Sequence, residues 1–128
     1  MQIQLIAAVA CGGALGAVGR YFVIAQVATW TGHGFPFGTL AVNVVGSFAM
    51  GVLVEVGALA WSPSPELRAF LTVGFLGAFT TFSTFSMETI LLYERGDLLQ
   101  CAAYVAGSVL LSVGGFFAAM FLLRTALT

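Results

Sequence analysis

The chain has 128 residues, of which 60% are hydrophobic and only 7% are charged, and its mean hydropathy is +1.06. A soluble domain carries about 25% charged residues, so this composition excludes a soluble globular protein and indicates an integral membrane protein. The formal net charge of −1 offers no basic patch for nucleic acid or for anionic lipid.

Four apolar stretches are predicted to cross the membrane, because a spanning helix needs about 20 residues. They cover about residues 4–28, 38–59, 67–93 and 98–123. Together they make one transmembrane domain over 1–128 and leave no room for a soluble domain. No charged side chain precedes Arg20, so the first stretch is expected to be a retained span and not a signal peptide.

The first span carries a small-residue motif and an arginine. Gly12 and Gly16 form a GxxxG motif, which lets another helix approach closely. Arg20 lies near the end of this span, several residues from the polar loop. Its side chain either extends to the membrane surface, or attracts an anion or binds a neighbouring carbonyl or carboxylate.

The second span places polar residues on one face of the predicted helix. Thr39 and Asn43 are one helical turn apart, so their side chains share a face. An asparagine in hydrocarbon must find a partner. Asn43 either forms an interhelical hydrogen bond or points its NH2 group at an anion in a pore. Glu55, close to the end of the span, is expected at the membrane interface.

The third span contains the run 80–86 (TTFSTFS), which has five hydroxyl residues in seven positions. Lipid cannot hydrogen-bond to hydroxyl groups or to loosened backbone, and Gly74 and Gly77 weaken the helix just before the run. These features predict a helix that breaks near 78–81, where transport proteins place ion sites. Glu88 follows the break and is interpreted either as a functional acid or as a paired interfacial acid.

The fourth span carries a line of hydroxyl groups and ends at Arg124. Tyr104, Ser108 and Ser112 recur every four residues, so they lie on one face of the helix. Each hydroxyl could instead bond to the carbonyl four residues earlier. Three such residues in line favour a polar path along the helix.

The arginines favour neither orientation in the membrane. With four spans, Arg68 and Arg124 fall on one side, and Arg20 and Arg95 fall on the other. Because an excess of positive charge normally sets the cytoplasmic side, equal numbers predict insertion in both orientations. The expected fold is an all-α integral membrane protein with four transmembrane helices, the third broken, assembled as a dual-topology antiparallel homodimer.

Three parts of the sequence resemble the Fluc (CrcB) family of fluoride channels. They are residues 74–77 (GFLG) together with 80–86 (TTFSTFS), residues 38–43 (GTLAVN) and residues 16–21 (GAVGRY). The likeness extends over essentially the whole chain, including its length and number of spans. The run 80–86 is the most specific of these motifs.

The resemblance implies a channel that passes fluoride passively out of the cytoplasm, through two pores between antiparallel subunits in the bacterial inner membrane. It implies a fluoride pathway lined by aromatic and polar side chains, which here are Asn43, Phe82, Phe85, Tyr104, Ser108 and Ser112, with Thr81, Ser83, Thr84 and Glu88 near the pore. Arg20 takes a vestibule or structural role. A structural sodium ion at the dimer centre is implied, held by the backbone carbonyls of Gly77 and Thr80. The implied partners are fluoride, sodium, the lipid bilayer and a second copy of the chain, without nucleic acid.

Other functions fit only parts of the sequence. A small proton-coupled multidrug exporter is also a four-span, dual-topology dimer, but its mechanism needs a buried acid central in the first span, and this span has none. A structural subunit of a larger membrane complex explains the glycines but not the run 80–86. An enzyme is not expected, because the single histidine, His33, lies in a predicted loop and no nucleophile is paired with a base.

Overall fold

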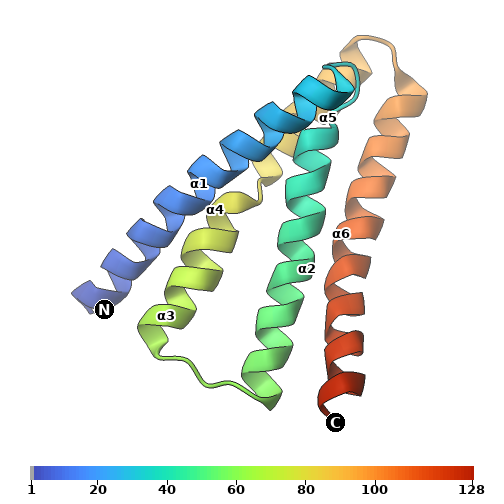
Figure 1. The fold of residues 1–128 in the computed structure, drawn as a ribbon. Helices are drawn as coiled ribbons and strands as arrows, with labels where there is room; N and C mark the ends of the chain where they lie inside the picture. The colour runs from blue at the N-terminus through green and yellow to red at the C-terminus, as the bar shows by residue number, and fades with distance from the viewer. Residues whose placement is uncertain (1) are drawn as a thin grey trace.

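The computed structural model describes residues 2–128 as a bundle of helices (Figure 1). Within this range four stretches are long and apolar enough to cross a membrane: Ile3–Thr31, Phe37–Leu59, Pro65–Glu94 and Leu98–Leu127. The predicted all-α architecture with four spans and an interrupted third span is confirmed. Figure 1 shows both termini and the loop between the second and third spans at one end of the bundle, with the other two loops at the opposite end.

Three of the spans are continuous α-helices, namely α1 (Ile3–Thr31), α2 (Phe37–Leu59) and α6 (Leu98–Leu127). α1 ends at Thr31, and the following Gly32 adopts φ 79° and donates its N–H to the Ala28 carbonyl at 2.8 Å. Glycine suits this positive φ angle because it has no Cβ atom. α1 and α6 both extend beyond the ends predicted at residues 28 and 123.

The third span is divided into α3 (Pro65–Ala69), the π-helical segment η1 (Phe70–Leu76), α4 (Gly77–Phe79) and α5 (Phe82–Glu94). The Ser64 hydroxyl caps α3 by accepting the Leu67 N–H at 3.1 Å. The helix is interrupted at Thr80 and Thr81, inside the predicted range 78–81. The π-helical segment was not predicted, because nothing in residues 70–76 distinguishes a wide turn from a regular one.

Glycines bring the backbone of α1 against that of η1, and Figure 1 shows α1 beside the first half of the third span. A Cβ atom on Gly12 would lie 2.3 Å from the Phe70 carbonyl oxygen, and one on Gly16 would lie 2.1 Å from that of Phe75. Atoms do not approach so closely without displacing the backbone, so these positions require glycine. The predicted role of the GxxxG motif in close packing is confirmed.

α2 and α6 lie side by side (Figure 1) and are joined at one end by an ion pair. The Glu55 side chain is 4% exposed, and its Oε1 lies 2.9 Å from Nε of Arg124. The prediction that Glu55 lies at the membrane interface stays a prediction. The structure shows that its carboxylate is buried within the bundle, where a cation from the last turns of α6 compensates its charge.

Removing the cation of this pair is expected to destabilise the fold. Breaking a buried ion pair costs about 3–5 kcal/mol. Because the Arg124 side chain is 59% exposed, water replaces part of the interaction, and we expect Arg124→Gln to lose less stability than a fully buried pair would. Thermal unfolding in detergent measures the loss. The double variant Glu55→Gln, Arg124→Gln should recover most of the lost stability, because no unpaired charge is left buried. An equal loss of stability in Arg124→Gln and in the double variant would contradict the argument.

Candidate functional site: a polar path at the break in the third span

The third span leaves helical geometry at Thr80 and Thr81, whose backbone is extended (Thr80 ψ 161°; Thr81 φ −152°, ψ 119°). Asn43 on α2 binds both exposed backbone groups of Thr81. Its Oδ1 accepts the Thr81 N–H at 2.7 Å, and its Nδ2 donates to the Thr81 carbonyl at 3.0 Å. Of the two interpretations of Asn43, the structure therefore shows the interhelical hydrogen bond, which uses one of the two N–H groups of Nδ2.

The break also takes the regular helical donors away from two carbonyl groups. In a continuous α-helix the Thr81 N–H bonds to the Gly77 carbonyl, and the Thr84 N–H bonds to the Thr80 carbonyl. Here the Thr81 N–H is donated to Asn43, and the Thr84 N–H is donated to Thr81 Oγ1 at 3.2 Å. The Gly77 and Thr80 carbonyls are thereby released from these bonds and can accept other ligands.

Arg20 binds a third carbonyl of the same region. Its Nε donates to the carbonyl oxygen of Ala78 at 2.9 Å, across a sequence separation of 58 residues. Of the interpretations of Arg20, the structure shows the one in which the side chain binds a neighbouring carbonyl. The half-buried guanidinium thus holds the end of α4 and places a positive charge beside the break.

A cavity of about 300 Å³ lies beside the break, walled by α2, the break itself, α5 and α6. Its lining combines a carboxamide, hydroxyl groups, two phenylalanine rings and two valines: Asn43, Ser47, Thr80, Thr81, Phe82, Phe85, Ser108, Val109, Ser112 and Val113. The ring centroids of Phe82 and Phe85 lie 5.5 Å apart. Phe82 is 78% exposed, so its ring stands at the open side of the cavity.

Three buried hydroxyl groups on α2 and α6 have no hydrogen-bond partner within residues 2–128. They are Oγ1 of Thr39 and Oγ of Ser108 and Ser112. The alternative in which these serines bond to carbonyls four residues earlier is therefore wrong. Buried polar groups nearly always have a partner, so this line of hydroxyls is suited to a ligand or water. Thr39 is missing from the predicted site, although its one-turn spacing from Asn43 is the signal that identifies it.

Tyr104 connects this line to Glu88. Its hydroxyl donates to Glu88 Oε1 at 3.0 Å, and its ring centroid lies 5.1 Å from that of Phe85. Tyr104 is fully buried, and Glu88 is thus an acid hydrogen-bonded inside the bundle. A second cavity, of about 220 Å³, begins at Thr39 and Glu88 and reaches the loop at His33.

Three of the predicted pathway residues line neither cavity: Tyr104, which contacts residues of both, and Ser83 and Thr84. Ser83 is exposed, with its hydroxyl 3.5 Å from that of Thr81, and the Thr84 backbone N–H is bound by the Thr81 hydroxyl. These contacts form the first turn of α5, for which Thr81 is the N-terminal cap. In the structure, Ser83 and Thr84 therefore belong to the first turn of α5.

These observations define a class: a multi-pass membrane protein with a polar path beside a broken helix. A model of the family described as "CrcB-like protein, Camphor Resistance (CrcB)" matches residues 7–120. The chain belongs to this family, and the resemblance predicted from its sequence is confirmed.

Relatives of known name give the same result. The chain is 58% identical over 124 residues to the fluoride-specific ion channel FluC of Rhodospirillum centenum, covering 97% of this chain and 98% of the relative. It is 48% identical over 124 residues, with the same coverage, to the protein of that name from Nitrobacter winogradskyi. It is 49% identical over 116 residues to that from Rhizobium etli, covering 91% and 93%.

The names of these relatives also bear on the other functions considered. The relatives are named ion channels, which agrees with the prediction that the chain is not an enzyme. Neither the family model nor these relatives support a multidrug exporter.

Proposed function

We propose that this chain is a fluoride channel, as the names of its relatives indicate. The observation in this molecule that carries the proposal is the line of buried hydroxyl groups without protein partners next to the Phe82–Phe85 pair. Leaving a buried hydroxyl without a hydrogen bond costs about 1–3 kcal/mol. A small anion that accepts hydrogen bonds compensates this cost.

The chemistry of the path suits fluoride, which is small and strongly hydrated. A pore must replace its water with other donors, and these are the hydroxyls of Thr39, Ser108 and Ser112 with the second N–H of Asn43. The ring edges of phenylalanine carry partial positive charge. Such an edge faces an anion without holding it tightly, and conduction requires an ion to leave as readily as it binds.

The proposed route connects the two cavities. It starts in the cavity at the break, passes the contact between Phe85 and Tyr104, and continues past Glu88 and Thr39 to the loop at His33. Tyr104 touches residues of both cavities. The route therefore leads from the middle of the third span to one end of the bundle.

We propose that two copies in opposite orientations enclose two such routes. One chain does not close its route, since Phe82 is 78% exposed and the extended residues Thr80 and Thr81 are only half-buried. Lipid offers the released carbonyl of Thr80 no hydrogen bond, so another polar or protein surface is needed there. The two-against-two division of the arginines between the sides of the membrane, predicted from the sequence, permits both orientations.

The break also suits the sodium ion of the proposed dimer. The Gly77 and Thr80 carbonyls have lost their helical donors, and unwound backbone carbonyls are the ligands that bind sodium in transporters. Within residues 2–128 no cluster of three histidine, cysteine or acidic side chains forms a competing metal site. A bound sodium ion supplies positive charge between the two routes, and we assign it a structural role.

The proposed transport is passive and directed outward across the bacterial inner membrane. Fluoride accumulates in the cytoplasm because its uncharged weak acid crosses the bilayer. A negative cell interior then drives the anion out, with about 2.3 kcal/mol for each 100 mV. The sequence contains no nucleotide-binding motif that would supply another source of energy.

Efflux from liposomes that contain the purified protein tests this function. We expect rapid fluoride efflux and slow chloride efflux, and equal rates for both ions would contradict the proposal. Phe82→Ile and Phe85→Ile should each lower fluoride efflux about tenfold, because an aromatic contact contributes about 0.5–1.5 kcal/mol. Phe22→Ile is the matched control, since Phe22 is exposed on α1 and outside both cavities. Unchanged flux in both pore variants would remove the ring-edge argument.

A further inference from the structure

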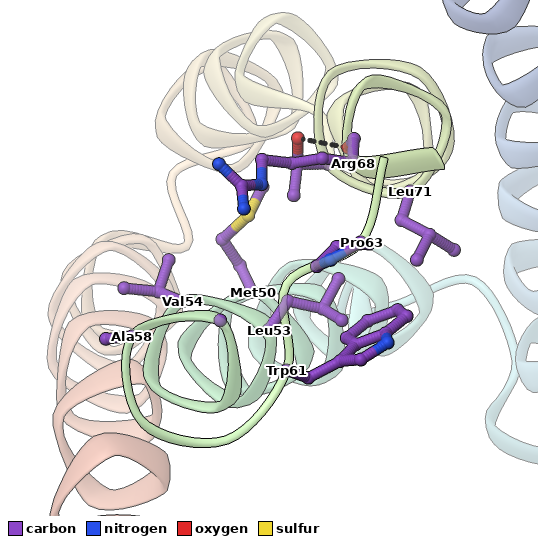
Figure 2. A pocket seen from close by; sticks show the side chains of 10 residues that line it. Met50, Leu53, Val54, Ala58, Trp61, Pro63, Arg68 and Leu71 are labelled. Carbon is purple, nitrogen blue, oxygen red and sulfur yellow. Dashed lines mark hydrogen bonds between the residues drawn. The ribbon is translucent and has the colours of Figure 1, made fainter. Parts of the chain in front are cut away.

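An apolar cleft of about 480 Å³ opens between α2 and the start of the third span (Figure 2). Its lining comes from α2, the loop that follows it, α3 and η1: Met50, Leu53, Val54, Gly57, Ala58, Trp61, Pro63, Arg68, Leu71 and Thr72. None of these residues lines the cavity at the break or the cavity near His33. The proposed fluoride route therefore leaves this cleft without an occupant.

The walls of the cleft suit a hydrocarbon chain. From Met50 to Ala58 the cleft follows α2 for about 12 Å, at 1.5 Å per residue. Figure 2 shows Leu53, Pro63 and Leu71 around the space between the helices. The hydroxyl of Thr72 is used inside the chain, because it donates to the Arg68 carbonyl at 2.8 Å. Such walls supply few hydrogen-bonding groups to replace the water around an ion.

A cation lies at the mouth of this apolar space. The side chain of Arg68 is exposed and forms no hydrogen bond or ion pair within residues 2–128. The other arginines are bound inside the chain: Arg20 to the Ala78 carbonyl, Arg95 to Asp97 and Arg124 to Glu55. Figure 2 shows the Arg68 guanidinium extending across the cleft toward Met50, with the indole of Trp61 on another side.

We propose that this cleft binds one anionic phospholipid of the surrounding bilayer. The phosphate lies at the Arg68 guanidinium, and an acyl chain occupies the space between α2 and η1. Charge complementarity supports this occupant, because arginine forms strong hydrogen bonds with phosphate and only an anionic lipid keeps a net negative charge for the guanidinium to compensate. Arg68 is in the first helix after the loop, at the level of the headgroups where tryptophan is also enriched. The chain has no basic patch, so the site depends on a single arginine.

Native mass spectrometry of the detergent-purified protein tests the site, with phosphatidylglycerol and phosphatidylcholine of identical acyl chains as probes. We expect about fivefold stronger retention of phosphatidylglycerol, the factor that corresponds to about 1 kcal/mol for one basic residue near anionic lipid. Arg68→Gln should abolish this preference. Arg95→Gln is the matched control, because it removes an exposed arginine from the opposite end of the bundle and should keep the preference.

A second variant tests the apolar part of the site. A Cβ atom on Gly57 would meet no atom within 4 Å, so Gly57→Leu should fold and fill the cleft. We expect it to weaken retention of both lipids while Arg68 stays in place.

Three results would overturn the proposal. They are equal retention of both lipids by the unchanged protein, equal behaviour of Arg68→Gln and Arg95→Gln, and a changed oligomeric mass of Gly57→Leu, which would assign the cleft to a second copy of the chain. Because the readout is bound lipid, failure of the site is distinguishable from failure of fluoride transport.

Discussion

Gly16→Ala is expected to cause the largest loss of stability in this chain. The added Cβ atom would lie 2.1 Å from the Phe75 carbonyl oxygen, and this neighbour is backbone that cannot rotate away. α1 and η1 must therefore separate, and overpacking of this kind costs about 3 kcal/mol or more. Thermal unfolding in detergent and the yield of monodisperse protein measure the effect.

Gly13→Ala is the matched control for this prediction, because it makes the same substitution one turn away in the same helix. Its Cβ atom would lie 3.9 Å from the Gly74 carbonyl oxygen, an ordinary contact. Alanine is favoured over glycine in a helix by about 1 kcal/mol, so this variant should be as stable as the unchanged protein or more stable. Equal stability of the two variants would show that the close approach of α1 to η1 is not required.

Asn43→Leu is expected to disrupt the break in the third span. The leucine has the same branching and number of heavy atoms but leaves the Thr81 N–H and carbonyl without the partners that now lie at 2.7 and 3.0 Å. Each unsatisfied buried group costs about 1–3 kcal/mol, so we expect a loss of about 2–5 kcal/mol and no fluoride efflux. Unfolding in detergent measures the first effect, and the liposome assay measures the second.

Two further variants separate the roles of Asn43. Ser47→Ala changes another polar residue of α2 that lines the same cavity and should leave stability nearly unchanged. Asn43→Asp keeps an acceptor for the Thr81 N–H, but it loses the donor to the Thr81 carbonyl and adds negative charge to the path. We expect Asn43→Asp to lower fluoride efflux strongly while it loses less stability than Asn43→Leu. Undiminished efflux in Asn43→Asp would exclude Asn43 from the anion path.

The third span shows which structural features the local sequence predicts and which it does not. The hydroxyl run and the preceding glycines predicted an interruption near 78–81, and the structure interrupts the helix at Thr80 and Thr81. The π-helical form of Phe70–Leu76 could not be predicted. It lies where Gly74 meets α1, with the Val9 carbonyl 2.9 Å from the position of a Cβ atom, and such a contact depends on a distant part of the chain.

The candidate site likewise combines features that local sequence predicts with features that depend on distant residues. Residue types and spacing predicted the polar lines on α2 and α6, but not the partners of their members. Asn43 binds Thr81 across 38 residues, and Arg124 binds Glu55 across 69 residues. Glu55 was expected at the interface because its position in the span is visible in the sequence, whereas the cation that permits its burial is not.

The sequence by itself determined the membrane class, the number of spans, the location of the break and the family, because hydropathy and backbone breakage depend on neighbouring residues. Only the tertiary structure decided which hydroxyls are left without partners, which carbonyls the break releases and where an apolar cleft meets a free arginine. These properties depend on the rotation and separation of packed helices, which small contacts such as those of Gly12 and Gly16 fix across the bundle.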